Sequence, residues 1–395
     1  MARYCRSPRD ILPSMKKAEV AIVGGGIIGA SIAYHLAARG VSGIVVFERE
    51  EELGTGSTGK CAGGVRLQFS TAANVEMSRI SIAALKRFEE ELGQPVDFKQ
   101  NGYLFVLTTE EHLEAFRSNA EKQKGLGVPV EVISPEEARG IVAELRIEDL
   151  VGATFCHEDG IANPHAIVQG YARGARRLGA TFLKSCEVTS MEVASDRVVS
   201  LTAGGERWEV GRVVNAAGPW AKVVAGFAGI QVPVEPVRRQ YFITKPLEWI
   251  PDNFPLLIDW GTGVYMHKES GGMLVGESDL KEPPSFHQQV DWDFLATVSE
   301  HAVARIPRLE EAEVATGVAG LYEISPDHNA ILGPVPGIEN FFCANGFSGH
   351  GMQHAPAVGL VIAEILTDGR AKSVDLAPYA IERFSRHSAG EYNVI

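Results

Sequence analysis

The strongest constraint on the fold is an apolar run followed by evenly spaced glycines near the start of the chain. Residues 19–23, Glu-Val-Ala-Ile-Val, form a short run that is apolar and largely β-branched after Glu19, and they lead directly into Gly24-Gly25-Gly26-Ile27-Ile28-Gly29. A helical periodicity then runs over 30–39, and a second apolar run at 43–47 ends in Glu48. The pattern predicts a strand, a Gly-x-Gly-x-x-Gly turn, a helix, a second strand and an acid.

Each glycine of this turn has its own physical role. Gly24 permits a tight turn, Gly26 lets the backbone approach a pyrophosphate, and Gly29 allows the helix to pack closely on the strand. The amides at the helix N-terminus are then free to bind phosphate. Glu48 lies where a carboxylate accepts hydrogen bonds from both ribose hydroxyls. The unit predicts a dinucleotide site; the alternative is a glycine turn that serves packing alone.

Further glycine-rich segments help to choose the dinucleotide, since the first unit is compatible with NAD and FAD alike. Residues 54–64 form a long loop of small residues, which suits an extended cofactor or else is a flexible surface loop. Small residues at 215–220 follow a strand expected at 210–214, and a glycine turn at 345–352 precedes a helix expected at 355–366. These segments explain much of the glycine surplus, 42 of 395 residues.

Charge and cysteine content exclude several classes of protein. The net charge of −13 argues against a protein that binds nucleic-acid phosphate. The five cysteines form neither a Cys-x-x-Cys motif nor a Cys/His cluster, so we expect reduced thiols, no metal site and a cytoplasmic location. The most apolar stretch is interrupted by glycines, so we expect no integral membrane segment. Residues 1–17 are expected to form a flexible extension, and 386–395 a tail.

The motifs together resemble those of the FAD-dependent amine oxidoreductases of the D-amino-acid oxidase superfamily. Within it, the chain is most similar to the sarcosine oxidase β subunit and the β subunit of L-proline dehydrogenase. The similarity covers about residues 18–385. The residues that carry it are Gly24-x-Gly26-x-x-Gly29 with Glu48, Gly56-Ser57-Thr58, Cys61-Ala62-x-Gly64-Val65-Arg66-x-Gln68-Phe69, Gln100-x-Gly102-Tyr103-Leu104-Phe105, Asn215-Ala216-Ala217-Gly218-Pro219-Trp220 and Gly346-Phe347-Ser348-Gly349-His350-Gly351.

The resemblance implies an α/β fold, α+β overall, with two interleaved domains. A Rossmann-type FAD-binding domain would be assembled from 18–95, 150–225 and 310–385. A substrate-binding domain, built on a mixed and largely antiparallel sheet, would comprise 96–149 and 226–309. Its strands are expected at 102–107, 239–244, 264–267 and 273–276.

The resemblance also implies FAD, bound non-covalently, as the cofactor. Monomeric sarcosine oxidases tether the flavin through a cysteine at the position of Gly320, which offers no side chain for attachment. The turn at 346–352 would cover the pyrimidine edge of the flavin, where a helix N-terminus favours negative charge. The cofactor contacts implied by position are Gly24, Gly26, Ile27, Ile28, Gly29, Glu48, Arg49, Gly56, Ser57, Thr58, Cys61, Ala62, Gly63, Gly64, Val188, Ala216, Ala217, Gly218, Trp220, Gly320, Gly346, Ser348, Gly349, His350, Gly351 and Met352.

Five further residues are implied to act on the substrate. Arg66 would pair with the substrate carboxylate, a bidentate task that suits a guanidinium; an ordinary ion-pair role is the alternative. Tyr265 and His267 would face the ligand from one strand face, or else are satisfied core residues. Tyr322 would stand beside the flavin. Gln353 replaces a carboxylate-binding lysine and adds a hydrogen bond without charge.

The expected activity is oxidation of a secondary amine or N-substituted amino acid, similar to sarcosine or proline. Hydride would pass from the α-carbon to FAD and leave an imine. The alternative is oxidative deamination of glycine or another primary amino acid, although such enzymes carry an arginine where Tyr322 stands. A flavin-binding factor without turnover and an NAD(P) dehydrogenase are further alternatives. Expected partners are the amine, dioxygen or another electron acceptor, and a partner subunit or a second copy of the chain.

Overall fold

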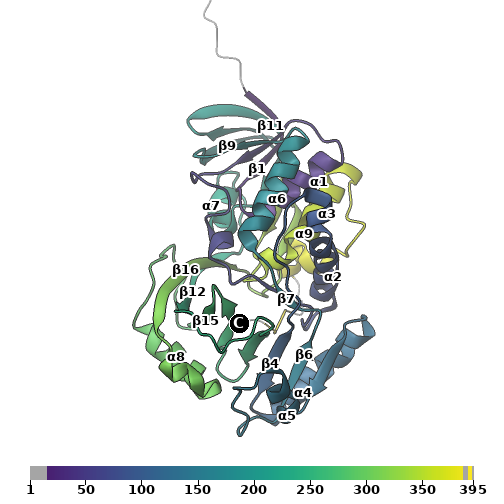
Figure 1. The fold of residues 1–395 in the computed structure, drawn as a ribbon. Helices are drawn as coiled ribbons and strands as arrows, with labels where there is room; N and C mark the ends of the chain where they lie inside the picture. The colour runs from purple at the N-terminus through teal and green to yellow at the C-terminus, as the bar shows by residue number, and fades with distance from the viewer. Residues whose placement is uncertain (1–15, 386–389, 394–395) are drawn as a thin grey trace, which may run out of the picture.

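The fold is built on two eight-stranded sheets, one above the other in Figure 1, each with its own helices. A two-stranded antiparallel sheet of β3 (Gly64–Val65) and β7 (Gly160–Ile161) completes the described strands. The structure is a computed structural model that describes residues 16–385 and 390–393. Residues 1–15 of the expected flexible extension lie outside the described part. Lys16 and Lys17 differ from that expectation, because they belong to the first strand, β1 (Lys16–Val23), and pair with the strand ending at Asn215.

The first sheet has a parallel centre. Strand β1 lies between two parallel neighbours, and an antiparallel hairpin extends one of them. This arrangement follows from β-branched runs that are apolar on both faces, as expected for strands covered on both sides. The strand order is β17 (Ile331–Val335), β18 (Ile338–Asn345), β11 (Glu206–Asn215), β1, β2 (Ile44–Phe47) and β8 (Thr181–Leu183), with the hairpin β9 (Val188–Ala194) and β10 (Arg197–Ala203) joined to β11.

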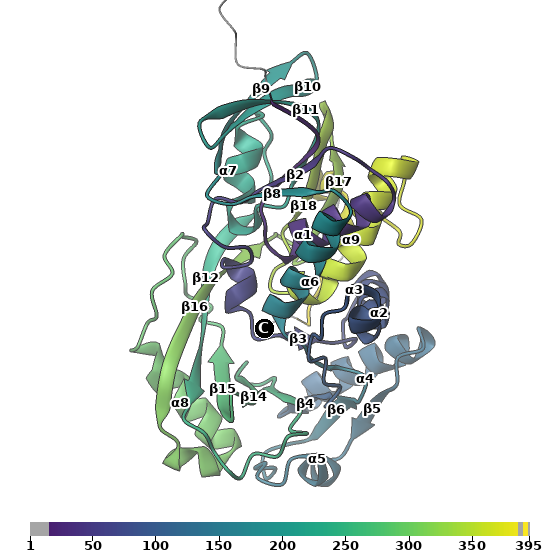
Figure 2. The ribbon, with the colours of Figure 1, turned by 45° about the horizontal axis from the view of Figure 1, so that its top comes forward.

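Helices cover one face of this sheet, and the hairpin and a short helix cover the other. Val20 and Ile22 of β1 face the helical core, whereas Ala21 and Val23 face the opposite one, as the alternation of a strand requires. Figures 1 and 2 both show helices lying side by side on the helical face. These are α1 (Ile27–Ala38), α6 (Pro164–Arg177) and α9 (Gly351–Asp368); α2 (Ala72–Lys86) and α3 (Phe88–Leu92) lie beyond them, and α7 (Ala221–Gly226) lies on the other face.

The second sheet is mixed and largely antiparallel. Only the β13–β4 pair is parallel among its described strand pairs. Helices α5 (Pro135–Ile141) and α8 (Phe294–Arg305) pack on one face, and α4 (Glu110–Gly125) packs on the opposite face beside β4. The order is β16 (Val314–Ile324), β12 (Glu235–Thr244), β15 (Gly272–Glu277), β14 (Tyr265–Glu269), β13 (Leu256–Asp259), β4 (Tyr103–Leu107), β6 (Gly152–Cys156) and β5 (Val130–Ile133). The α/β class with a Rossmann-type sheet and a mixed second sheet is confirmed.

Two strands belong to a different sheet from the one that the expected domain boundaries imply. Strands β6 and β16 fall in ranges assigned to the FAD-binding domain, yet both pair within the second sheet. The cause for β16 is its long ladder with β12, which runs from Ile324 opposite Glu235 to Val314 opposite Thr244. The division into two domains stays a prediction.

The expected C-terminal tail is packed where the structure describes it. Glu391 is 1% exposed and Asn393 is 3% exposed, so these two side chains pack into the fold, whereas Tyr392 between them is exposed. Residues 386–389 and 394–395 lie outside the described part. Within the described ranges, no helix combines the length and apolarity needed to cross a membrane.

The contact between α1 and β1 gives a first prediction. A Cβ on Gly29 would lie 1.9 Å from the carbonyl oxygen of Gly24, a backbone atom that cannot move aside cheaply. We expect Gly29→Ala to lower the free energy of unfolding by about 3 kcal/mol, as overpacking does. Urea denaturation followed by circular dichroism measures this change.

The matched control is Gly140→Ala, because a Cβ there meets open space on helix α5. The helical propensity of alanine should leave stability unchanged or raise it by up to about 1 kcal/mol. Equal destabilisation by both substitutions would contradict the packing role of Gly29.

Candidate active site

A cavity of about 530 Å³ lies between the two sheets and receives residues from both. All of the expected cofactor residues line it except Gly29 and Gly346. Gly29 lies behind the wall, against Gly24, which fits its expected packing role. Of the expected substrate residues, Arg66, Tyr265, Tyr322 and Gln353 line the cavity, and His267 does not.

One end of the cavity has the features of a dinucleotide site. Gly24 has a φ of +111°, and a Cβ there would lie 2.3 Å from the Ala216 carbonyl oxygen, so only glycine lets the two segments approach. The Glu48 carboxylate accepts hydrogen bonds from the backbone N–H of Gly25 at 2.7 Å and of Glu50 at 2.8 Å. Burial raises the pKa of Glu48, and these two hydrogen bonds oppose that rise.

The N-terminus of helix α1 opens onto this end. Gly26 caps the helix without a side-chain hydrogen bond, and the Ile27 amide donates to Thr58 Oγ1 at 3.2 Å. Helix N-terminal amides attract anions, so a pyrophosphate fits here. Arg49 stacks on the Trp220 ring, with its guanidinium carbon 3.6 Å from the ring centroid.

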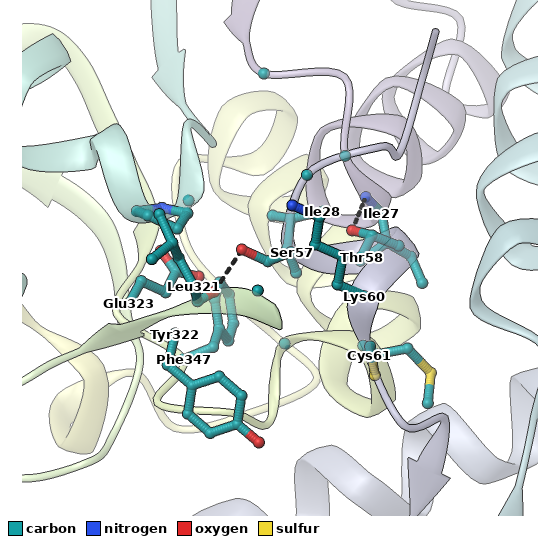
Figure 3. A pocket seen from close by; sticks show the side chains of 18 of the residues that line it. Ile27, Ile28, Ser57, Thr58, Lys60, Cys61, Leu321, Tyr322, Glu323 and Phe347 are labelled. Atoms are coloured by element: carbon teal, nitrogen blue, oxygen red, sulfur yellow. Dashed lines mark hydrogen bonds between the residues drawn. The ribbon is translucent and has the colours of Figure 1, made fainter. Parts of the chain in front are cut away.

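The glycine-rich loop at 54–64 is held between the two sheets. It contains a short 3₁₀ helix, η1 (Ser57–Lys60), whose Ser57 hydroxyl donates to the Leu321 carbonyl of β16 at 2.6 Å. Figure 3 shows Ser57 and Thr58 with their hydrogen bonds, one to β16 and one to α1. The loop therefore connects the dinucleotide end with the strand that carries Tyr322.

The opposite end of the cavity is formed by one face of the second sheet. Tyr265 pairs with Gly276 across β14 and β15, and Gly276 pairs with Tyr241 across β15 and β12, so these three residues share a face. Gly276 leaves room for Tyr265, since a Cβ there would lie 2.4 Å from the tyrosine ring. Burial raises the pKa of Tyr241 and of Tyr322 to about 12 and raises that of Tyr265 well above its usual value, so the hydroxyls stay neutral at physiological pH.

Arg66 is 3% exposed and its acceptors are carbonyls and a histidine rather than a carboxylate. Nη1 donates to the Gln68 carbonyl at 2.5 Å, and Nη2 donates to the Asn393 carbonyl and lies 3.2 Å from His350 Nε2. Burial and the Arg66 charge hold the pKa of His350 well below its usual range, so the imidazole is a neutral acceptor. The Arg66 amide donates to Gln353 Oε1 at 2.7 Å, which joins two expected site residues directly.

Two buried carboxyl groups support the segment that carries Arg66. Asp159 accepts from the Leu67 amide at 2.6 Å and from Gln68 Nε2 at 3.0 Å. Burial raises the pKa of Asp159 to about 7. Glu391 accepts from the backbone and hydroxyl groups of Ser70 and Thr71, and these and other hydrogen bonds lower its pKa despite burial.

His267 differs from the expectation that it faces the ligand. Its ring is 1% exposed, with Nε2 3.0 Å from the Ala62 carbonyl and Nδ1 2.9 Å from the Lys268 carbonyl. Burial lowers the pKa of His267. Alternation places it on the same strand face as Tyr265, but one step further along, where it supports the glycine-rich loop instead of lining the cavity.

Sequence reasoning missed several residues of the substrate end. Alternation along the strand predicts that Arg239 and Tyr241 lie on the same face. The sequence alone does not say whether that face meets the cavity, because this depends on the neighbouring strands. The missed lining residues are Lys60, Tyr103, Arg239, Tyr241, Gln288 and Glu323. The described cysteines Cys61, Cys156, Cys186 and Cys343 are free thiols, and no cluster of three or more potential metal ligands occurs in the ranges that the structure describes.

The glycine turn, the Glu48 acid and the extended cavity define a dinucleotide-binding protein. The family of FAD dependent oxidoreductases (DAO) matches residues 19–365, and the chain belongs to this family. The protein is therefore an FAD-dependent oxidoreductase. The cavity fits FAD, because a helix N-terminus, a ribose-binding acid and close backbone passages occur together at one end.

Individual relatives are similar over nearly the whole chain. FAD-dependent oxidoreductase domain-containing protein 1 of Xenopus laevis is 32% identical over 98% of this chain and 87% of its own length. Mitochondrial sarcosine dehydrogenase of Mus musculus is 30% identical over 98% of this chain, which spans only 43% of that relative. The crystal structure of L-proline dehydrogenase from P. horikoshii has a TM-score of 0.89 and 34% identity, covering 95% of this chain and 100% of that one. Because one of these relatives is described as mitochondrial, the cytoplasmic location stays a prediction.

The buried Asp159 gives a pH-dependent prediction. Its folded pKa of about 7 lies above the ordinary value of 3.8, so its contribution to stability is fully present below about pH 4 and is lost as the pH rises through 7. Asparagine keeps an acceptor and does not titrate. We expect the free energy of unfolding of the wild type, relative to Asp159→Asn, to fall by about 2–3 kcal/mol between pH 5 and pH 8, measured by urea denaturation.

Asp97→Asn is the matched control, because this carboxylate is exposed to solvent and its removal should change stability little at either pH. A difference between wild type and Asp159→Asn that stays constant from pH 5 to pH 8 would show that Asp159 titrates in the folded protein as it does in water.

Proposed function

We propose that the protein oxidises a secondary amine or N-substituted amino acid of the sarcosine or proline type. Hydride leaves the α-carbon of the substrate and an imine forms. The observation that carries this proposal is the charge pattern at the substrate end of the cavity: a buried cation, neutral tyrosines and a neutral carboxyl group.

The cation is Arg66, whose role is to bind the substrate carboxylate. Its present acceptors are carbonyls and the neutral His350, so its positive charge is not neutralised by a contact ion pair. A guanidinium in a water-poor site binds a carboxylate through two parallel charge-assisted hydrogen bonds. Gln353 accepts from the Arg66 backbone and fixes the position of this residue.

The surroundings of the amine favour its neutral form. The acidic residues that line the cavity in the described structure are Glu48, Glu50, Glu187 and Glu323. The first three belong to the dinucleotide end or adjoin Val188. Burial raises the pKa of Glu323 to about 8, so the neutral carboxylic acid predominates at pH 7. With no ionised carboxylate to stabilise an ammonium, the amine binds with a free lone pair, which hydride loss from the α-carbon requires.

FAD, when bound, supplies the acceptor for the hydride and its two electrons. The chain's own residues do the positioning: Arg66 holds the carboxylate, and the aromatic face of Tyr265 and Tyr322 excludes water around the amine. The nitrogen lone pair forms the C=N bond as the C–H bond breaks, which gives an iminium ion. Loss of its N–H proton to water gives the imine, which is then released or hydrolysed. Orientation of the α-carbon supplies much of the rate enhancement, because it converts a bimolecular encounter into a local one.

The relatives support this substrate class. Two of them are named as dehydrogenases of sarcosine and of L-proline, and both compounds are secondary amines with one carboxylate. A crystal structure of glycine oxidase from Geobacillus kaustophilus is also similar, at 25% identity and a TM-score of 0.83, so a primary amine belongs in any test. The electron acceptor and any partner subunit stay proposals, since this chain spans less than half of the sarcosine dehydrogenases.

An anaerobic panel of amines tests the proposal directly. The purified yellow protein is mixed with sarcosine, L-proline or glycine, and the loss of flavin absorbance is followed. We expect bleaching by one or both secondary amines at a rate at least tenfold above that with glycine. Faster bleaching by glycine would favour deamination of primary amino acids, and a stable spectrum with every amine would contradict the proposal.

Substitution of Arg66 tests the carboxylate anchor. We expect Arg66→Gln to lower kcat/KM for the best amine by about 100-fold, mainly through KM, because a charge-assisted pair is lost. Arg66→Lys should recover part of the loss. Arg173→Gln removes an exposed arginine of helix α6 and serves as the charge-matched control. Equal kinetics for Arg66→Gln and this control would exclude Arg66 from substrate binding.

A further inference from the structure

A second arginine lines the substrate end of the cavity and has no place in the binding scheme described so far. Arg239 lies on β12, directly opposite Gly320 of β16, and shares a strand face with Tyr241 two residues further on. It lines the cavity together with Tyr265 and Tyr322. Gly320 places no side chain directly opposite Arg239, and the ring that the guanidinium faces on β16 is that of Tyr322.

The hydrogen bonds of Arg239 leave part of its guanidinium unused. Nη1 donates to the carbonyl oxygens of Arg238 at 2.9 Å and Asp279 at 3.3 Å. Nε is buried and has no hydrogen-bond partner among the residues that the structure describes. Buried donors are almost always satisfied in folded proteins, so an unpartnered nitrogen at a cavity wall indicates a position that a ligand fills.

The neighbouring Arg238 shows what a structural arginine looks like on the same strand. Alternation turns it to the other face, where Nη2 lies 2.6 Å from Glu282 and 3.4 Å from Asp291. Arg238 is thus neutralised by contact ion pairs, whereas Arg239 donates hydrogen bonds to carbonyl oxygens, and the carboxylates of Asp279 and Glu282 act on it without a contact ion pair in the described structure. The two residues differ in their environment and not in their charge.

Tyr322 lies within electrostatic reach of both cavity arginines. The guanidinium carbon of Arg239 is 5.7 Å from the centroid of the Tyr322 ring. Arg239 and Arg66 each oppose the rise in the pKa of Tyr322 that burial causes. A ligand bound beside this tyrosine is therefore close to two positive charges.

We propose that Arg239 is a second anion-binding residue of the substrate site, and that the preferred substrates are secondary amines with two carboxylates. One carboxylate binds Arg66 and the other binds Arg239, with the amine between them. The inference rests on the proposed function, because it assumes that an amine is oxidised here. It adds the substrate class: an N-substituted amino acid whose substituent is itself acidic.

Equilibrium binding of unreactive analogues tests the inference without turnover. Oxydiacetate and methoxyacetate carry two carboxylates and one, with an ether oxygen in place of the amine, so neither supplies the nitrogen lone pair. Their dissociation constants are measured with the FAD-loaded protein from the shift in flavin absorbance. We expect oxydiacetate to bind at least tenfold more tightly than methoxyacetate, and Arg239→Gln to reduce this ratio by about 10- to 100-fold.

Two further variants distinguish an effect of the Arg239 guanidinium itself from a general effect of removing a positive charge from β12. Arg239→Lys keeps a charge without the planar fork and should retain part of the ratio. Arg238→Gln removes the same charge from the opposite face of the same strand, and the ratio should stay within twofold of the wild type. A ratio of two affinities in one sample is independent of the fraction of protein that is folded.

Three results would overturn the inference. The first is that the wild type binds both analogues equally. The second is that Arg239→Gln weakens the binding of both analogues equally, which would make Arg239 the anchor of a single carboxylate. The third is that Arg239→Gln shifts the flavin spectrum and leaves the affinity ratio unchanged, which would make Arg239 a flavin contact. Kinetics with iminodiacetate and sarcosine keep this failure distinct from that of the proposed function. If sarcosine bleaches the flavin and iminodiacetate has no advantage, only the inference fails; if neither bleaches it, the proposed function fails as well.

Discussion

The site depends on a short segment that is hydrogen-bonded to both sheets. Thr58 accepts from the first turn of α1, and Ser57 donates to Leu321 on the strand that carries Tyr322. Eight residues later the same segment delivers Arg66 into the buried end of the cavity. The spacing between the N-terminus of α1 and Arg66 is thus set by covalent connection and two hydrogen bonds. Glycine makes the segment feasible, since a Cβ on Gly59 or Gly64 would collide with Gly54 or Tyr103.

Burying Arg66 is costly, and the structure offsets the cost without neutralising the charge at the cavity. Its guanidinium donates to carbonyl oxygens and stacks 4.1 Å from the Phe69 ring centroid, while Asp159 and Glu391 act from behind the wall. Glu391 is itself held by hydrogen bonds from Ser70, Thr71 and Asn74, so the segment at 390–393 keeps the Asn393 carbonyl against the arginine. A carboxylate in direct contact with Arg66 would compete with an acidic ligand for the same guanidinium donors.

Local sequence patterns predicted the dinucleotide end well and the substrate end only in part. The turn at Gly24 and the acid Glu48 belong to one unit of about 30 residues, so spacing alone locates them. Gln353 meets the Arg66 backbone across 287 residues of sequence, and only the family resemblance brought those two together. His267 shows the limit of alternation, which gives the face of a strand but not the distance along it to the cavity. Glu391 was expected in a free tail, because a polar C-terminal segment carries no periodic signal of the donors that bind it.

The position of Arg239 in the cavity was also not predictable from its own strand, because it depends on how that strand pairs in the sheet. Arg239 is distinguished from Arg238 only by which face of β12 it occupies, and that face is defined by the register with β15 and β16. Once the register is known, the glycines at 276 and 320 acquire a common role, since each removes a side chain opposite a large cavity residue, Tyr241 or Arg239. The sheet thereby exposes a cation and three phenol rings to the same space. Such a surface discriminates ligands by the number and position of their negative charges, because neutral hydroxyls orient a substrate whereas only guanidinium groups repay the desolvation of a carboxylate.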